Sequence, residues 1–124
     1  MAGEMAMNVV VAVMTDLFFL VQVIGAAKPL GLQVVCVKDK ATALAKVSAG
    51  AALMLVDLTC AAAEPVALIE EAKSLASIRM VGFLPHVQTE LRQQALDAGC
   101  DVVVARSAFA QRLPELLAEA VRHA

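Results

Sequence analysis

The sequence predicts an α/β domain in which helices cover both faces of a parallel sheet. Three observations support this fold class. Apolar segments rich in β-branched residues alternate with segments of helical pattern, and we count five of each. The connections are short, and the apolar segments lack polar alternation, as is typical of strands buried on both faces. The length of 124 residues is that of one domain.

The composition excludes two broad classes. Sixty per cent of the residues are hydrophobic and 18% are charged, which excludes an intrinsically disordered chain. The net charge is −2, so there is no basic surplus to neutralise phosphates, and we expect no nucleic-acid partner.

The first strand and helix are expected within an apolar run over residues 5–24, which is long enough to resemble a membrane span. Asp16 lies near its centre, where a carboxylate costs about 2.5–3.5 kcal/mol, and no basic residue precedes the run. We therefore expect no membrane segment. Instead, Asn8–Met14 is predicted to be a buried strand, and Thr15 or Asp16 to cap the helix that follows.

The second strand and helix are marked by turn residues. Leu32–Val37 is rich in β-branched residues and follows the turn signal of Pro29 and Gly31. Ala41–Ser48 is predicted to be a short helix that Gly50 ends.

The third strand is expected at Ala52–Asp57, an apolar run that ends in an acid. Glu64 and Pro65 mark the start of a helix over Pro65–Ala76. The fourth strand is expected at Arg79–Leu84.

The last three elements follow the same alternation. Thr89–Ala98 has helical spacing and ends at Gly99, and Asp101–Ala105 reads as the fifth strand. The last helix is expected from about Gln111 to Arg122, with Pro114 either in its first turn or at a kink.

These elements fit a flavodoxin-like doubly wound sheet of strand order 2-1-3-4-5. Ligands bind such a sheet beyond the carboxyl ends of strands 1 and 3. Asp16 follows strand 1, Asp57 ends strand 3, and Arg106 and Ser107 follow strand 5. Two carboxylates and a guanidinium are therefore predicted to converge at one edge of the sheet.

Two segments carry a resemblance to a known family. One is LVD, which ends at Asp57, and the other is AGCDVVVARS, in which Arg106 comes seven residues after Gly99. With them the chain resembles, over essentially its whole length, the receiver domain of two-component response regulators. The resemblance implies that Asp57 is the phosphoacceptor candidate, that Arg106 stands in place of a lysine, and that Thr15-Asp16 replaces an acidic pair.

The chain departs from the family at its switch positions. Strand 4 ends in Leu84-Pro85 where the family has a hydroxyl, Val103 stands at the aromatic position, and Ser107 replaces a proline. In the family, the hydroxyl and the ring carry the response to phosphorylation, and carboxylates hold a divalent ion. The planar fork of Arg106 cannot act as a compact ammonium. We expect it to reach Asp57 and Asp16 and to occupy the cation's place. No cofactor is expected, and Mg²⁺ at Asp16 and Asp57 is expected to bind weakly if at all.

Two functions follow. We favour a stand-alone pseudo-receiver, a signalling module that binds other proteins without the phosphorylation switch. The alternative is a working phosphoacceptor receiver, phosphorylated on Asp57 by a histidine kinase or phosphotransfer protein. No dinucleotide motif, P-loop, or nucleophile with a base is present, so we expect no enzyme. Residues 1–124 are expected to form one receiver-like domain without an output domain. The odd count of three cysteines predicts a reduced, cytoplasmic protein, and the resemblance implies a bacterial one.

Simpler interpretations of the site residues stay open. Asp57 could cap a loop, Asp16 could only cap a helix, and Arg106 could be a structural ion-pair partner. His86 and Cys60 lie on the expected rim, but a lone loop histidine is usually solvated, and Cys60 has no basic neighbour in sequence.

The first helix is apolar nearly all round, which predicts a second contact surface. Leu20, Val21 and Ile24 are the candidates for an interface with a partner or a second copy. The alternative is cover by the last helix, whose apolar residues could lie alongside: Leu113, Leu116, Leu117 and Val121.

Overall fold

The computed structural model describes residues 8–86 and 88–122. Its five parallel strands form one sheet of order β2-β1-β3-β4-β5, which confirms the predicted fold class and strand order. The strands are β1 (Val9–Val13), β2 (Gln33–Val37), β3 (Leu53–Asp57), β4 (Arg79–Leu84) and β5 (Val102–Ala105).

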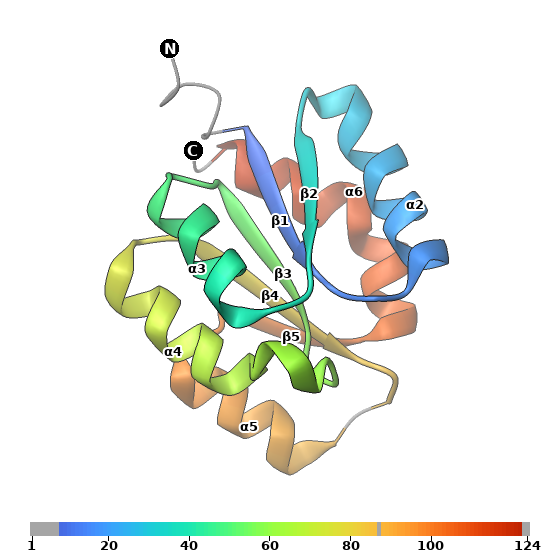
Figure 1. Ribbon diagram of the computed structural model, residues 1–124. Coiled ribbons are helices and arrows are strands. Elements are labelled where there is room, and N and C mark those ends of the chain that lie inside the picture. Colours follow the sequence, from blue (N-terminus) through green and yellow to red (C-terminus); the bar gives the residue numbers. More distant parts are fainter. Residues whose placement is uncertain (1–7, 87, 123–124) are drawn as a thin grey trace.

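Five α-helices connect and follow the strands, in two layers (Figure 1). They are α2 (Leu17–Ala27), α3 (Lys40–Ser48), α4 (Pro65–Leu75), α5 (Thr89–Ala98) and α6 (Arg106–Arg122). Two short 3₁₀ turns, η1 (Lys28–Leu30) and η2 (Ala61–Ala63), follow α2 and precede α4. Helices α2 and α6 cover one face of the sheet, and α3, α4 and α5 cover the other.

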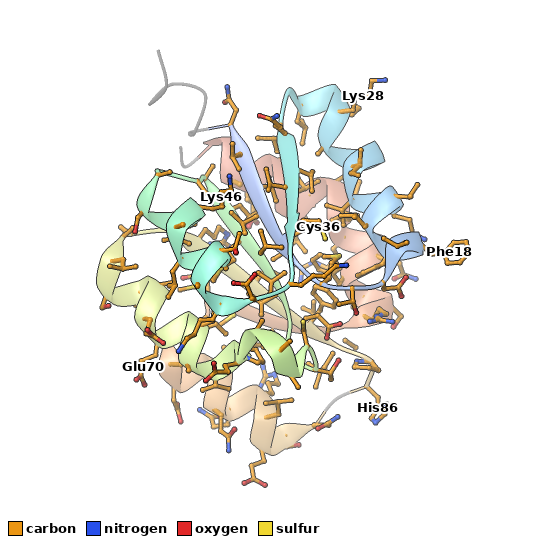
Figure 2. The ribbon with its side chains drawn as sticks, viewed as in Figure 1. Phe18, Lys28, Cys36, Lys46, Glu70 and His86 are labelled. Carbon is orange, nitrogen blue, oxygen red and sulfur yellow. The ribbon has the colours of Figure 1, made fainter. Side chains whose placement is uncertain are left out.

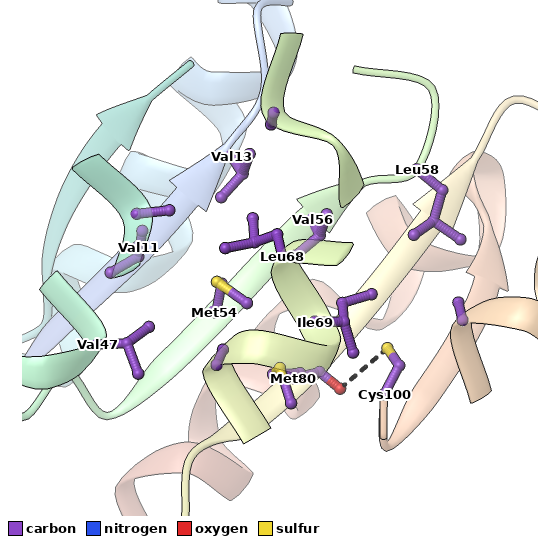
Figure 3. Close-up of a cluster of buried hydrophobic side chains, with 14 of the residues drawn as sticks. Val11, Val13, Val47, Met54, Val56, Leu58, Leu68, Ile69, Met80 and Cys100 are labelled. Carbon is purple, nitrogen blue, oxygen red and sulfur yellow. Dashed lines mark hydrogen bonds between the residues drawn. The ribbon is translucent and has the colours of Figure 1, made fainter. Parts of the chain in front are cut away.

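Each face of the sheet has its own hydrophobic core. The core under α3, α4 and α5 contains apolar side chains without aromatic rings, among them Val11, Met54 and Leu68 (Figure 3). The core under α2 and α6 contains the buried phenylalanines Phe83 and Phe109. Most strand residues of β1, β3 and β4 are fully buried, as expected of strands covered on both faces.

The last helix differs from its prediction. It begins at Arg106, directly after β5, and not near Gln111, so Pro114 lies in its interior. A proline there removes one helical hydrogen bond, to the carbonyl of Ala110. The helix continues because its apolar side, including Phe109 and Leu113, is buried against the sheet.

Helix α6 packs alongside α2, as the alternative interpretation expected, but it covers only one side of that helix. Leu113, Leu116 and Leu117 share the core with Phe19 and Val23, whereas four large apolar residues of α2 stay exposed: Leu17, Phe18, Val21 and Ile24. The side chain of Val121 lies outside the described part of the chain. None of the helices within residues 8–86 and 88–122 combines the length and apolarity that a membrane crossing needs. From residue 9 on, the apolar run divides into β1 and the start of α2.

Candidate functional site

Asp57 is the only charged residue among the buried side chains of the described core, with 5% of its surface exposed. It ends the central strand β3 and is in register with Phe83 of β4. Its Oδ1 accepts hydrogen bonds from the backbone N–H of Thr59 at 2.9 Å and from the Thr59 hydroxyl at 2.6 Å. The carboxylate therefore shapes the loop after β3, as the simpler interpretation proposed, and its second oxygen faces the edge of the sheet.

Asp16 lies at the end of the neighbouring strand β1 and caps α2. Its Oδ1 accepts from the backbone N–H of Phe19 at 3.1 Å, which satisfies one of the free N–H groups of the first turn. Asp16, and not Thr15, is thus the N-cap. Its other oxygen is left to face the site.

Arg106 joins the two carboxylates. Its Nη1 lies 3.3 Å from Oδ2 of Asp16, and its Nη2 lies 3.4 Å from Oδ2 of Asp57. The planar guanidinium directs its two terminal nitrogens to different partners, which a single ammonium could not do in the same way. The predicted convergence of these three residues is found in the structure.

The guanidinium also lies over aromatic rings. Its Cζ is 5.3 Å from the ring centroid of Phe19 and 6.0 Å from that of Phe83, within the range of cation–π attraction. Its Nε is buried and makes no hydrogen bond to any described residue. The rings therefore provide the floor on which the charged group rests.

Phe109 packs against these two rings and completes the aromatic floor, and none of the three phenylalanines was predicted as part of the site. The ring centroids of Phe19, Phe83 and Phe109 lie 4.6–5.2 Å apart. A signal was available: Phe19 follows Asp16 by three residues, and Phe109 follows Arg106 by three. In a helix, such spacing places both members of a pair on one side.

The residues at this edge are a poor fit for a divalent cation. Within residues 8–86 and 88–122 no three histidine, cysteine, aspartate or glutamate side chains gather, so a cation such as Mg²⁺ would have to rely on one or two carboxylates. The two carboxylates present already share the guanidinium of Arg106. A metal ion would have to displace a positive charge to reach either oxygen.

The other candidates lie apart from this cluster. Ser107 is exposed, and among the described residues no hydrogen bond joins it to either carboxylate. Leu84 and Val103, at the two switch positions, are buried in the core under α3–α5. His86 is exposed in the loop after β4 (Figure 2), and Cys60 is buried, so its thiol is not accessible.

No protein-family model and no curated protein matches the sequence. Solved structures do match. The receiver domain protein of Methanospirillum hungatei JF-1 superposes with a TM-score of 0.75 at 20% identity, covering 94% of this chain and 98% of that one. A response regulator from Hahella chejuensis gives a TM-score of 0.79 at 17% identity, covering 92% and 95%.

A third match is a response regulator protein from Burkholderia pseudomallei, solved with a phosphorylated aspartic acid, a calcium ion and citrate. Its TM-score is 0.71 at 20% identity, and the match covers 90% of this chain and 72% of that one. At such identities the likeness concerns the fold. The chain therefore has the fold of response-regulator receiver domains, which confirms the predicted resemblance at that level.

Proposed function

We propose that this chain is a receiver-like signalling module that acts by binding another protein, and that it has lost the phosphorylation switch. The observation that carries the proposal is the position of Arg106, which pairs with Asp16 and Asp57 at the edge of the sheet. This is the edge at which the receivers it resembles hold their metal ion and accept the phosphoryl group.

Both oxygens of Asp57 are already engaged. Two hydrogen bonds from Thr59 reach Oδ1, and Arg106 faces Oδ2. A carboxylate attacks a phosphodonor through a free oxygen, with a cation placed to neutralise the incoming phosphoryl charge. Here Arg106 occupies the oxygen that would attack, and its positive charge repels a metal ion from the same place, which opposes phosphorylation.

This chain also lacks the side chains that transmit the effect of phosphorylation from the site to the surface in receivers. In receivers, a hydroxyl on strand 4 moves toward the phosphate, and an aromatic ring on strand 5 follows it. This chain has Leu84 and Val103 at those positions, both buried in an aliphatic core. Neither side chain can form a hydrogen bond to a phosphoryl group.

Without the switch, the module presents the same binding surface at all times. A binding protein of this kind needs no catalytic group, and we assign none. The second candidate, a working phosphoacceptor, is favoured by one feature: a buried aspartate ends the central strand at the acceptor position.

The test is the intact mass of the protein after incubation with an acyl phosphate and Mg²⁺. We expect no addition of a phosphoryl group. A phosphoryl group on wild type that is lost in Asp57→Asn would overturn the proposal and support the second candidate. The double variant Thr15→Asp/Arg106→Lys, which restores the acidic pair and the ammonium, is the matched comparison under the same conditions.

A further inference from the structure

Helix α2 has two apolar sides, and one of them is uncovered. Phe19, Val23 and Ala27 face the sheet and are buried. The exposed side is formed by four large residues, whose surfaces are exposed by 46–87%: Leu17, Phe18, Val21 and Ile24. At 100° per residue these four lie opposite the buried stripe. We call them the α2 face.

The α2 face carries no charge of its own. No acidic or basic residue occurs between Asp16 and Lys28, and Gln22 is the only polar side chain in the helix. Figure 2 shows the ring of Phe18 pointing away from the rest of the chain. A surface that matches this face must therefore be apolar along a similar length.

We propose that the α2 face binds the α2 face of a second copy, with the two helices antiparallel and the twofold axis near Val21. This inference supplies a partner for the proposed function and rests on it only in that the module acts by binding. Two complementary features of the helix favour a second copy over an unrelated protein.

The first feature is shape. In the antiparallel arrangement, Phe18 of one copy lies beside Ile24 and Gly25 of the other. A side chain added at Gly25 would meet no heavy atom within 4 Å, so the helix surface there is open. The largest projecting ring thus meets the flattest position of the helix, and the twofold axis makes this contact twice.

The second feature is charge. The exposed Lys28 follows α2, whereas the carboxylate of Asp16 before α2 is already paired with Arg106. Antiparallel pairing keeps the two Lys28 side chains at opposite ends of the paired helices and aligns the helix dipoles favourably. Parallel pairing would bring Lys28 against Lys28. Exposed charges of this kind contribute more to the relative orientation of the two helices than to the affinity of the dimer.

Sedimentation velocity of the full chain over a series of micromolar concentrations tests the proposal. We expect a monomer–dimer equilibrium, and we expect Val21→Glu to be monomeric while its thermal unfolding stays cooperative. The matched control is Leu75→Glu, which places the same charge on another exposed apolar residue, in α4. It should dimerise as wild type does. A wild-type chain that is monomeric throughout, or Val21→Glu that still dimerises, would overturn the proposal.

The variant Gly25→Leu distinguishes the proposed antiparallel packing from non-specific hydrophobic association. Leucine favours the helix more than glycine does and adds apolar surface, so a non-specific patch would associate more strongly. The proposed dimer loses the space for Phe18 and should weaken at least about tenfold in dissociation constant. Tighter association would contradict the proposal.

Mild oxidation of Val21→Cys tests the orientation. A residue near the twofold axis meets its own copy, so we expect a disulfide-linked dimer, and none for Leu75→Cys. Equal linkage of the two would contradict the arrangement. These outcomes are independent of the mass measurement on Asp57, so the failure of one proposal can be told from the failure of the other.

Discussion

Nη2 of Arg106 lies 3.4 Å from Oδ2 of Asp57, although the two residues are 49 positions apart in sequence. The parallel sheet brings them together, because β3 and β5 end at the same edge. The side chain of Asp57 is 7% exposed and that of Arg106 is 34% exposed. Solvent therefore reaches the pair from the side of Arg106 and screens the attraction between the two charges only in part.

Arg106→Ala should destabilise the fold. The substitution leaves Asp16 and Asp57 facing each other without a cation, and one of these carboxylates is buried. We expect a loss of about 1–3 kcal/mol in the free energy of unfolding at neutral pH, between the values for exposed and buried pairs. Urea denaturation measures it. Arg112→Ala is the control on the same helix, because Arg112 is more exposed and its pair with Glu115 is 3.8 Å long. It should cost less than about 0.5 kcal/mol.

Mg²⁺ should bind weakly. Arg106 already neutralises the carboxylates, and Thr15 supplies no second acid beside Asp16. Following the amide signals around Asp16 and Asp57 in an NMR titration, we expect no saturation below the millimolar range. Thr15→Asp/Arg106→Lys should bind at least about tenfold more tightly. Saturable submillimolar binding by wild type would contradict this expectation.

Neighbouring phenylalanines should differ sharply when truncated. Phe19 is buried against Phe83 and Phe109, so Phe19→Ala should cost about 3–5 kcal/mol. Phe18 is 87% exposed, so Phe18→Ala should cost less than about 0.5 kcal/mol in the free energy of unfolding. Both are measured by chemical denaturation at a concentration below that at which the chain self-associates. Equal losses would show that the helix is rotated from its described position.

Stability at alkaline pH should depend on Cys100. Burial raises the pKa of its thiol from 9.0 to about 11, and backbone hydrogen bonds, which lower the pKa, offset this only in part. Because the raised pKa belongs to the folded state, the native chain holds the proton longer than the unfolded one. Stability is therefore fully present below pH 9 and is lost as the pH rises toward about 11.

The free energy of unfolding should fall by about 2–3 kcal/mol for this one group. Comparing wild type with Cys100→Ala across this pH range isolates it from other titrating groups. The difference in stability between the two proteins should shrink as the pH rises. A constant difference would show that the thiol titrates normally in the fold.

Much of the fold could be predicted because its local signals agree with its tertiary structure. The strand of residues Leu53–Asp57 is a continuous apolar run, and glycines such as Gly99 end helices where the pattern ends. The start of α6 could not be predicted in this way. Pro114 is locally a helix breaker, but burial of the apolar side of α6 outweighs the lost hydrogen bond.

The site was predictable in part. The rule that parallel strands end at one edge brought Asp16, Asp57 and Arg106 together. The aromatic floor was not predicted, because it depends on the rotation of α2 about its axis. The sequence places Phe18 and Phe19 side by side, and only the three-residue spacing of Phe19 from Asp16 indicates which one faces the sheet. Leu20, one of the three interface candidates, is half-buried against the core for the same reason, while Phe18 is exposed.

The central claim is that Arg106 serves as the resident cation of Asp57, and a double-mutant cycle tests it most directly. The free energy of unfolding is measured for wild type, Arg106→Ala, Asp57→Ala and the double variant at neutral pH. We predict a coupling energy of about 1–3 kcal/mol, because Arg106→Ala leaves the buried carboxylate of Asp57 without a cation, whereas Asp57→Ala leaves Arg106 paired with Asp16 alone. Additive losses, with a coupling energy within about 0.3 kcal/mol of zero, would contradict the account.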